Sequence, residues 1–192
     1  EYFANYFLHM SDVTFDMATN QMEVHQGHAE PWKITLVDTG EQTQTGGRIK
    51  RVQEYIDGTF CLTYGDGVCD INMKKLVEYH QKQGTLATLT AIQPAGRFGS
   101  IEIAGDRVIN FLEKPQGDNR WISGGFFVCE PGVFDRLYGE ETIWEREPLE
   151  SLAHDHELSV YKHDGFWAAM DTQRDKLYLE KLWNEAKIGN NP

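Results

Sequence analysis

Two aspartates stand at the ends of apolar, strand-like segments that lie far apart in the chain. Asp66 follows the segment 60–64, and Asp171 follows the segment 166–170. Magnesium in proteins is usually held by a few carboxylates together with substrate phosphates, rather than by a complete protein cage. The two aspartates therefore predict a magnesium-dependent site for phosphate transfer.

A charged pair lies between the two aspartates in the sequence. Glu113 and Lys114 end a strand-like run that Pro115 stops, because proline has no N–H to donate to a sheet. A lysine at that point can neutralise a phosphate, and the glutamate can accept protons from sugar hydroxyls. Strand ends also carry charges simply for solubility, so that alternative stays open.

Two glycine-containing runs could bring the backbone close to a ligand. The run from Thr45 to Arg48 offers N–H groups and a guanidinium at an expected helix start, which suits an anion or a base edge, although a surface turn is the alternative. The run from Ser123 to Gly125 lies inside a strand and indicates a bulge or a close backbone approach.

The segments that would position these residues alternate between strand and helix. We expect a buried strand over 60–64, a helix over 73–83 capped by Asp70 or Asn72, and a second strand over 86–92. This order predicts an α/β fold with parallel pairing, in which ligands bind at the carboxyl ends of the strands. An Asp-Gly pair such as the one at position 66 also favours a hairpin turn, but here a capped helix pattern follows.

The other expected elements are shorter and are spread over both ends of the chain. Strands are expected over 34–37, 101–103, 108–112, 122–128, 158–161 and 166–167, and helices over 49–56, 131–138, 147–153 and 174–187. The last helix is expected to bury Leu177, Tyr178, Leu182, Trp183 and Ala186.

Composition limits the possible partners. The chain has 192 residues, enough for one globular domain, and a formal net charge of -12, which argues against broad contact with nucleic acid or an anionic membrane. It has no apolar run long enough to span a bilayer and no secretory pattern. Cys61 and Cys129 lie in apolar strands, which indicates buried, reduced thiols and a cytoplasmic protein.

The N-terminal residues predict two further features. One face of a helix that no capping residue precedes carries Tyr2, Phe3, Tyr6 and Phe7, so we expect that a preceding segment is missing. Residues 11–33 alternate only weakly between apolar and polar, which indicates short strands or an extended arm. This arm is our candidate for subunit contact in a homo-oligomer.

Several other residues have a simpler interpretation than catalysis. The pairs His25/His28 and His154/His156 lack the spacing of a zinc site, so surface histidines are expected. Trp144 precedes a helix among charges and could stack on a sugar, but core or interface packing is the more common role. The sequence has no GxSxG nucleophile motif.

Six motifs taken in order resemble the sugar-phosphate nucleotidyltransferases, from residue 1 to about residue 183. The motifs are Thr45-Gly46-Gly47-Arg48, Tyr64-Gly65-Asp66-Gly67, Gly96-Arg97-Phe98-Gly99, Phe111-Leu112-Glu113-Lys114-Pro115, Ser123-Gly124-Gly125-Phe126-Phe127, and Phe166-Trp167 with Met170-Asp171-Thr172. The resemblance implies a Rossmann-like (GT-A-like) mixed sheet flanked by helices, with small β-rich additions. It also implies a single nucleotidyltransferase domain over 1–192 that lacks the family's N-terminal GGxGTR-type nucleotide loop.

Within that family, the match is closest to the members that form CDP-glucose and pyrophosphate from CTP and glucose 1-phosphate, for deoxysugar and polysaccharide synthesis. Catalytic roles are then implied for Lys114, Asp66 and Asp171, with Mg²⁺ on the two aspartates. Nucleotide contacts are implied for Thr45, Gly47, Arg48 and Gly65, and sugar-phosphate contacts for Gly99, Glu113, Lys114, Ser123, Gly125 and Trp167. The family carries asparagine at the position of Ser123, which implies an altered sugar contact.

Two other functions remain open on the sequence. A non-catalytic sugar-nucleotide-binding or oligomer-forming fragment of the family would bind ligand without turnover. A glycosyltransferase with a similar α/β core would transfer its sugar to an acceptor faster than it released pyrophosphate.

Overall fold

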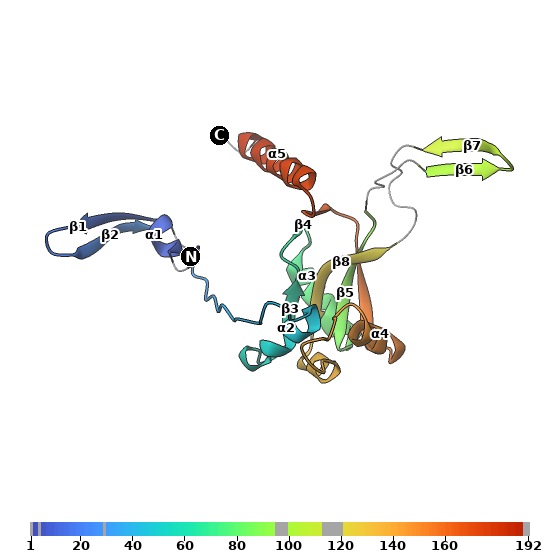
Figure 1. The fold of residues 1–192 in the computed structure, drawn as a ribbon, viewed down its shortest axis with the longest axis horizontal. Helices are drawn as coiled ribbons and strands as arrows, with labels where there is room; N and C mark the ends of the chain where they lie inside the picture. Colours follow the sequence, from blue (N-terminus) through green and yellow to red (C-terminus); the bar gives the residue numbers. More distant parts are fainter. Residues whose placement is uncertain (1, 4, 29, 95–99, 113–120, 190–192) are drawn as a thin grey trace. The chain divides into compact units, whose positions relative to one another are not determined.

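The computed structural model describes residues 2–3, 5–28, 30–94, 100–112 and 121–189 (Figure 1). The chain divides into two compact units, Glu1–Asp38 and Thr39–Pro192, and each is described by itself. The second unit is a mixed α/β structure, which confirms the predicted fold class.

The first unit is a hairpin with a short helix before it. α1 (Tyr6–His9) leads into β1 (Ser11–Asp16), which pairs antiparallel with β2 (Gln21–Gly27). The register places Val13 opposite Val24 and Phe15 opposite Met22, so the apolar residues share one face. The short strands predicted within 11–33 are confirmed.

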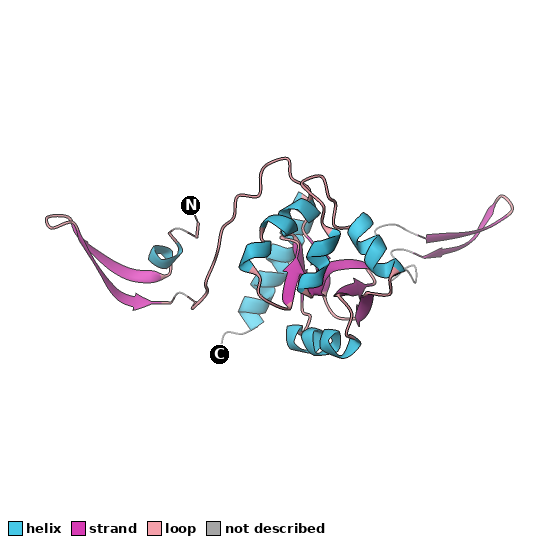
Figure 2. Ribbon diagram, turned by 90° about the horizontal axis from the view of Figure 1, so that it is seen from below, coloured by secondary structure: helices cyan, strands magenta, loops and turns pink. Residues whose placement is uncertain are grey.

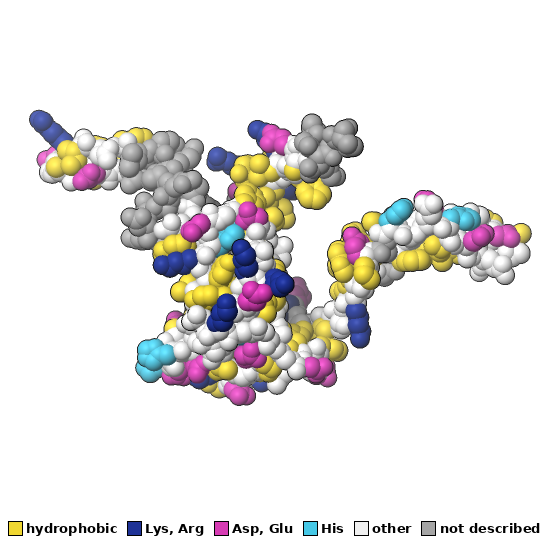
Figure 3. All heavy atoms as spheres, turned by 180° about the vertical axis from the view of Figure 1, so that it is seen from behind, with side chains coloured by type: hydrophobic (Ala, Val, Ile, Leu, Met, Phe, Trp, Pro, Cys, Tyr) yellow, Lys and Arg dark blue, Asp and Glu magenta, His cyan; other side chains and the backbone are white. Residues whose placement is uncertain are grey.

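No residue described in the first unit is fully buried. Its apolar side chains lie at the surface (Figure 3), and Phe15 is 55% and Met22 48% exposed. The strand predicted over 34–37 is wrong, because that segment has no regular structure and no strand of the described chain pairs with it. The tyrosine hydroxyl of Tyr6 donates to Glu30, which raises the pKa of Tyr6 to about 12.

A four-stranded sheet forms the centre of the second unit. Its order is β3 (Phe60–Thr63), β8 (Ile122–Cys129), β5 (Ala87–Ile92) and β9 (Leu158–His163). β8 runs antiparallel to both of its neighbours, and β5 pairs parallel with β9. β3 and β5 therefore run in the same direction, as strand-helix-strand order predicted, but β8 lies between them.

Helices lie around this sheet (Figure 2). α3 (Met73–Gln83) precedes β5 in the chain, and it begins where the Asn72 side chain accepts a hydrogen bond of 3.0 Å from the Lys75 N–H. It ends at Gly84, which has a φ of 66°, in the left-handed region that favours glycine. Sequence reasoning predicted both ends of this helix correctly.

The other face of the sheet carries the main apolar core. Besides α1, α3 and α5, the described residues form four helical elements. These are α2 (Thr45–Arg51), the 3₁₀ helices η1 (Gln53–Tyr55) and η2 (Pro131–Arg136), and α4 (Glu147–His154). η2 replaces the α-helix predicted over 131–138.

Trp144 is fully buried against Phe127, with ring centroids 5.8 Å apart, so its role is core packing. Cys129 is buried as predicted, whereas Cys61 is exposed on the edge strand β3.

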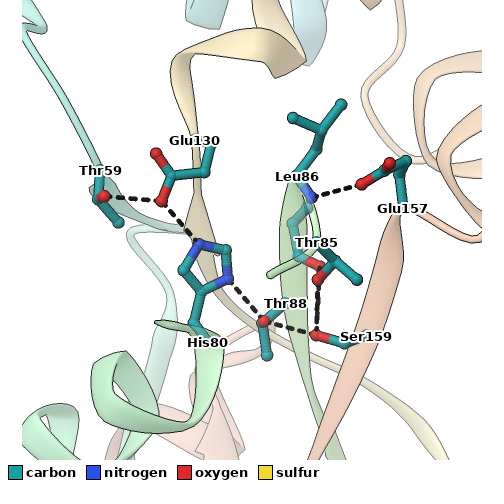
Figure 4. Close-up of polar contacts among 9 residues, drawn as sticks. Thr59, His80, Thr85, Leu86, Thr88, Glu130, Glu157 and Ser159 are labelled. Atoms are coloured by element: carbon teal, nitrogen blue, oxygen red, sulfur yellow. Dashed lines mark hydrogen bonds and ion pairs between the residues drawn. The ribbon is translucent and has the colours of Figure 1, made fainter. Parts of the chain in front are cut away.

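A buried histidine connects α3 to the sheet (Figure 4). His80 is 1% exposed; its Nδ1 lies 2.8 Å from the Thr88 hydroxyl and its Nε2 lies 3.2 Å from Glu130. The chain of contacts continues from Thr88 to Ser159, and from Glu130 to Thr59. We call these five residues the His80 cluster; it satisfies the polar groups that α3 buries against the sheet.

Two further strand pairs and a terminal helix complete the second unit. β4 (Gly67–Cys69) pairs antiparallel with β10 (Trp167–Ala169), and β6 (Ser100–Ala104) pairs with β7 (Arg107–Leu112). α5 (Gln173–Gly189) leaves Leu177, Tyr178 and Trp183 between 51% and 65% exposed, so the predicted burial of this face is wrong. Among the described residues, no helix combines the length and apolarity needed to cross a membrane.

Candidate active site

The pairing of β4 with β10 brings the two aspartates together. Ala169 lies opposite Gly67, and the next backbone bond runs from the Met170 N–H to the Asp66 carbonyl at 2.9 Å. Asp171 follows Met170 directly, so its backbone lies close to that of Asp66 although 105 positions separate the two in the sequence. Both residues are exposed.

Short links tie this strand pair, which we call the ribbon, to the main sheet. Residues 64–66 connect β3 to β4, and residues 164–166 connect β9 to β10. Because each link has three residues, the ribbon cannot lie far from the strand ends of the sheet. Asp66 is therefore at the carboxyl end of β3, where ligands bind in open α/β sheets.

A bulge in β8 contacts both the ribbon and the link that carries Asp66. From the partner of Ala91 to the partner of Leu89, β8 advances by four positions, whereas β5 advances by only two. Gly125 in this bulge has a φ of 76°, and its carbonyl accepts the Tyr64 N–H at 3.3 Å. The indole N–H of Trp167 donates to the Gly124 carbonyl at 2.8 Å. Both alternatives for this run, a bulge and a close backbone approach, are thus observed.

Glu145 holds two hydroxyl groups beside Asp66. Its carboxylate accepts hydrogen bonds from the Thr45 hydroxyl at 2.7 Å and from the Tyr64 hydroxyl at 2.5 Å. Burial, followed by this contact with Glu145, raises the pKa of Tyr64 far above its ordinary value, so the phenol stays protonated at neutral pH. Thr45, Tyr64 and Glu145 are called the Glu145 cluster below.

An open pocket of about 490 Å³ is lined by the Glu145 cluster together with Gly65 and Asp66. It thus contains residues for which the sequence predicted nucleotide contacts (Thr45, Gly65) and metal binding (Asp66). Open space surrounds the Cα of Gly65, since a Cβ there would meet no atom within 4 Å. The pocket has room for a ligand next to a carboxylate and a phenolic hydroxyl.

The remaining residues of the 45–48 run have internal contacts. The N–H groups of Gly46 and Gly47 both donate to the Thr142 carbonyl, at 2.9 and 3.2 Å. The Arg48 guanidinium donates to the Thr39 hydroxyl at 2.7 Å and to the Glu41 carbonyl. In this structure, therefore, Thr45 faces the pocket, while Gly47 and Arg48 hold the helix start against neighbouring loops.

The predicted sugar-phosphate residues fall into two groups. Ser123 is exposed, and its hydroxyl lies 3.3 Å from the Gly125 N–H. Trp167 is the first residue of β10 in the ribbon, and Gly125 contacts the link that leads to β4. Gly99, Glu113 and Lys114 lie outside the described residues.

Sequence reasoning missed Tyr64 and Glu145 as members of the pocket. Tyr64 directly precedes the Gly-Asp-Gly run, and that position was a usable signal. Glu145 carried no such signal, because it reaches Thr45 across 100 positions of sequence.

The donor set fits magnesium rather than a softer metal. The described residues contain no group of three or more His, Cys, Asp or Glu side chains that could enclose an ion. The ribbon instead places the backbones of two aspartates next to each other; their carboxylates are hard oxygen donors, and this small set suits Mg²⁺ when substrate phosphates supply further ligands. The four histidines expected at the surface, His25, His28, His154 and His156, are indeed exposed.

Comparisons with known proteins agree with this geometry. A family model described as nucleotidyl transferase matches residues 10–172, and the chain belongs to that family. It is 56% identical over 189 residues to the glucose-1-phosphate cytidylyltransferase of Salmonella typhimurium, covering 97% of this chain and 74% of the relative. It is 28% identical over 157 residues to a mannose-1-phosphate guanyltransferase of Aspergillus oryzae, covering 77% of this chain and 42% of that one.

Solved structures show the same fold at low identity. A UDP-glucose pyrophosphorylase complexed with UDP-glucose superposes with a TM-score of 0.56 at 15% identity, covering 78% of this chain and 65% of that chain. The HddC protein of Yersinia pseudotuberculosis gives a TM-score of 0.54 at 20% identity, covering 74% and 64%. Nucleotidyltransferases with a Rossmann-like mixed sheet are therefore the structural neighbours of this protein.

Proposed function

We propose that this protein is a cytidylyltransferase that transfers CMP from CTP to glucose 1-phosphate, giving CDP-glucose and pyrophosphate. The observation that carries the proposal is the pairing of β4 with β10, which places Asp66 next to Asp171 in a chain 56% identical to a glucose-1-phosphate cytidylyltransferase. Carboxylates near one point can hold a metal ion there, and such an ion offsets the charge repulsion of the two phosphate groups that must approach each other.

In the proposed reaction, an oxygen of the sugar phosphate forms a new bond to the α-phosphorus of CTP. The bond from that phosphorus to the oxygen bridging it to the β-phosphate breaks, and pyrophosphate leaves with the electron pair. The attacking phosphate is already ionised at neutral pH, so the chain needs no general base. Its residues position the two phosphates and reduce their charge repulsion.

Asp66 and Asp171 would hold Mg²⁺, which when bound neutralises phosphate charge. The protonated Tyr64 hydroxyl and Thr45 keep the Glu145 carboxylate in place at the edge of the pocket. Thr45 and Gly65 are proposed to contact the nucleotide, and Gly125, Ser123 and Trp167 the sugar phosphate. Gly47, Arg48, Gly99, Glu113 and Lys114 keep their proposed roles from the family resemblance, with Lys114 on the sugar phosphate.

The deciding experiment is an assay of pyrophosphate release with CTP, UTP, dTTP and ATP, each with glucose 1-phosphate, with and without Mg²⁺. Turnover that requires Mg²⁺ and is fastest with CTP supports the proposal. Faster turnover with another nucleotide would refute the choice of CTP. Binding of the sugar nucleotide without turnover would instead favour the non-catalytic alternative.

We also propose a cytoplasmic homo-oligomer in which residues 11–33 contact a second subunit. The apolar pairs Val13/Val24 and Phe15/Met22 lie on one face of the β1–β2 hairpin, and Phe15 is 55% exposed. Such a face is commonly covered by a partner. Light scattering on a variant without this hairpin should show smaller particles, and an unchanged mass would refute the subunit contact.

A further inference from the structure

The two ends of the ribbon are held in different ways. At one end, the Met170 N–H donates to the Asp66 carbonyl at 2.9 Å. At the other end, the Asp70 N–H donates to the Phe166 carbonyl at 3.2 Å. Asp70 thus lies four positions beyond Asp66, on the side of the ribbon where the chain arrives from β9.

His163 contacts this second end from the main sheet. It is the last residue of β9, where it lies opposite Ile92 of β5, and its side chain is 12% exposed. Its Nε2 lies 2.9 Å from the Asp70 carboxylate and 3.3 Å from the Phe166 carbonyl. Both partners are acceptors, so this nitrogen must carry a hydrogen to bind either of them.

The connecting link is shaped around this contact. Gly165 stands between His163 and β10, and a Cβ at that position would lie 2.6 Å from the His163 ring carbon Cε1 and would also collide with the Asp70 carboxylate. Only glycine allows the imidazole and the carboxylate to meet there. The link has three residues, so a displacement of His163 would move the start of β10 directly.

We propose that His163 and Asp70 form a clamp that positions the ribbon and thereby sets the separation of Asp66 and Asp171. This inference rests on the proposed magnesium-binding role of the two aspartates. β9 is paired with β5 along its whole length, so it provides a fixed support for the ribbon. His163 and Asp70 touch no substrate in this proposal; they are positioning residues for the reaction.

The test compares His163→Ala with His163→Gln, whose side-chain amide keeps an N–H donor near the position of Nε2. In His163→Ala, we expect the Mg²⁺ concentration for half-maximal activity to rise on the order of tenfold, because misplaced ligands lose catalytic geometry. The KM for CTP at saturating Mg²⁺ should change far less, and His163→Gln should recover most of the activity. Asp70→Ala should match His163→Ala, and the double variant should add little.

Two matched controls separate positioning from general destabilisation. His154→Ala removes a histidine that also contacts an aspartate, Asp155, but whose side chain is 89% exposed. Asp57→Asn removes an exposed carboxylate away from the ribbon. Both controls should keep the wild-type Mg²⁺ dependence.

The clamp is refuted if a folded His163→Ala protein has the Mg²⁺ dependence of the controls. If His163→Ala does not fold, Asp70→Ala decides, because the Asp70 side chain is 60% exposed and its replacement leaves the core intact. If Asp66→Asn is inactive while the His163 and Asp70 variants keep the wild-type Mg²⁺ dependence, only the clamp is refuted. Full turnover in Asp66→Asn refutes the proposed metal role of Asp66, whereas absence of turnover in the wild type with all four nucleotides refutes the proposed function itself.

Discussion

The His80 cluster and the Glu145 cluster both join hydroxyl groups to one carboxylate across long stretches of sequence. In the His80 cluster, His80 and Thr88 are at most 1% exposed and each finds a protein partner within the cluster. In the Glu145 cluster, the same kinds of bond leave the carboxylate at the wall of an open pocket beside Asp66. A closed network fastens a helix to a sheet, whereas an open one prepares a surface for a ligand.

The largest expected effect is a loss of activity without a loss of stability, at the two aspartates near the Glu145 cluster. Asp66→Asn or Asp171→Asn should lower turnover on the order of 10³-fold, because each removes a proposed metal ligand. The free energy of unfolding in urea should change by less than about 0.5 kcal/mol, since both residues are exposed. Asp57→Asn is the control for carboxylate removal, and near-normal turnover in either aspartate variant would contradict the metal assignment.

A change in the His80 cluster should lower stability and leave turnover nearly unchanged. His80→Ala should lower the free energy of unfolding by about 2–4 kcal/mol, since it leaves a cavity and unpaired polar groups. Turnover of the folded fraction should stay within about twofold of the wild type. His154→Ala, at an exposed site, should be nearly neutral. A large loss of turnover in folded His80→Ala would show that the two clusters are not functionally distinct.

Alanine substitutions at two glycines with positive φ distinguish the cost of backbone strain from the cost of a steric clash. Gly125→Ala introduces a Cβ 2.7 Å from the Tyr64 ring at a φ of 76°, and should cost about 2–3 kcal/mol of unfolding free energy together with activity. Gly84→Ala also has a positive φ, of 66°, but its Cβ would meet nothing within 4 Å, so about 1 kcal/mol is expected. Equal costs in urea denaturation would mean that the contact with Tyr64 is unimportant.

The smallest expected effect concerns the Tyr64 hydroxyl. Because the folded pKa is raised, the folded protein holds this proton more tightly than the unfolded chain does. The resulting stabilisation is complete below about pH 10 and is lost as the pH rises further. The wild type should therefore be more stable than Tyr64→Phe at pH 8, and this advantage should shrink above pH 10.

Urea unfolding of the wild type and of Tyr64→Phe, at pH 8 and above pH 10, measures this effect. Turnover of Tyr64→Phe should fall by about tenfold or less, because Glu145 keeps its bond to Thr45. An advantage of the wild type that grew with pH would contradict the assigned direction of the Tyr64 pKa.

Local signals in the sequence were enough for α3 and for the pair of aspartates. The cap at Asn72 and the closing Gly84 act within one helical turn, so the sequence alone predicts the ends of α3. Asp66 and Asp171 stand out because each follows an apolar strand-like run. Their place at a ligand site then follows from the general rule that ligands bind at the carboxyl ends of strands.

Features that depend on distant partners could not be predicted. β4 has three residues and no alternation pattern, and it is a strand only because β10 pairs with it. Residues 34–37 have a better strand composition but no partner among the described strands. Cys61 resembles Cys129 in its apolar surroundings, yet β3 is an edge strand, so only Cys129 is buried.

The bulge at Gly124 and Gly125 adds an even number of residues to β8. Side chains alternate with a period of two, so this insertion leaves the facing of every residue on both sides unchanged, whereas a single inserted residue would reverse it. A deletion of one glycine should therefore turn Ser123 and Ile122 to the opposite face of the sheet. A deletion of both would restore a regular strand, but it would remove the carbonyl that Trp167 binds. Such a chain would keep its sheet and lose an anchor of the strand that leads to Asp171.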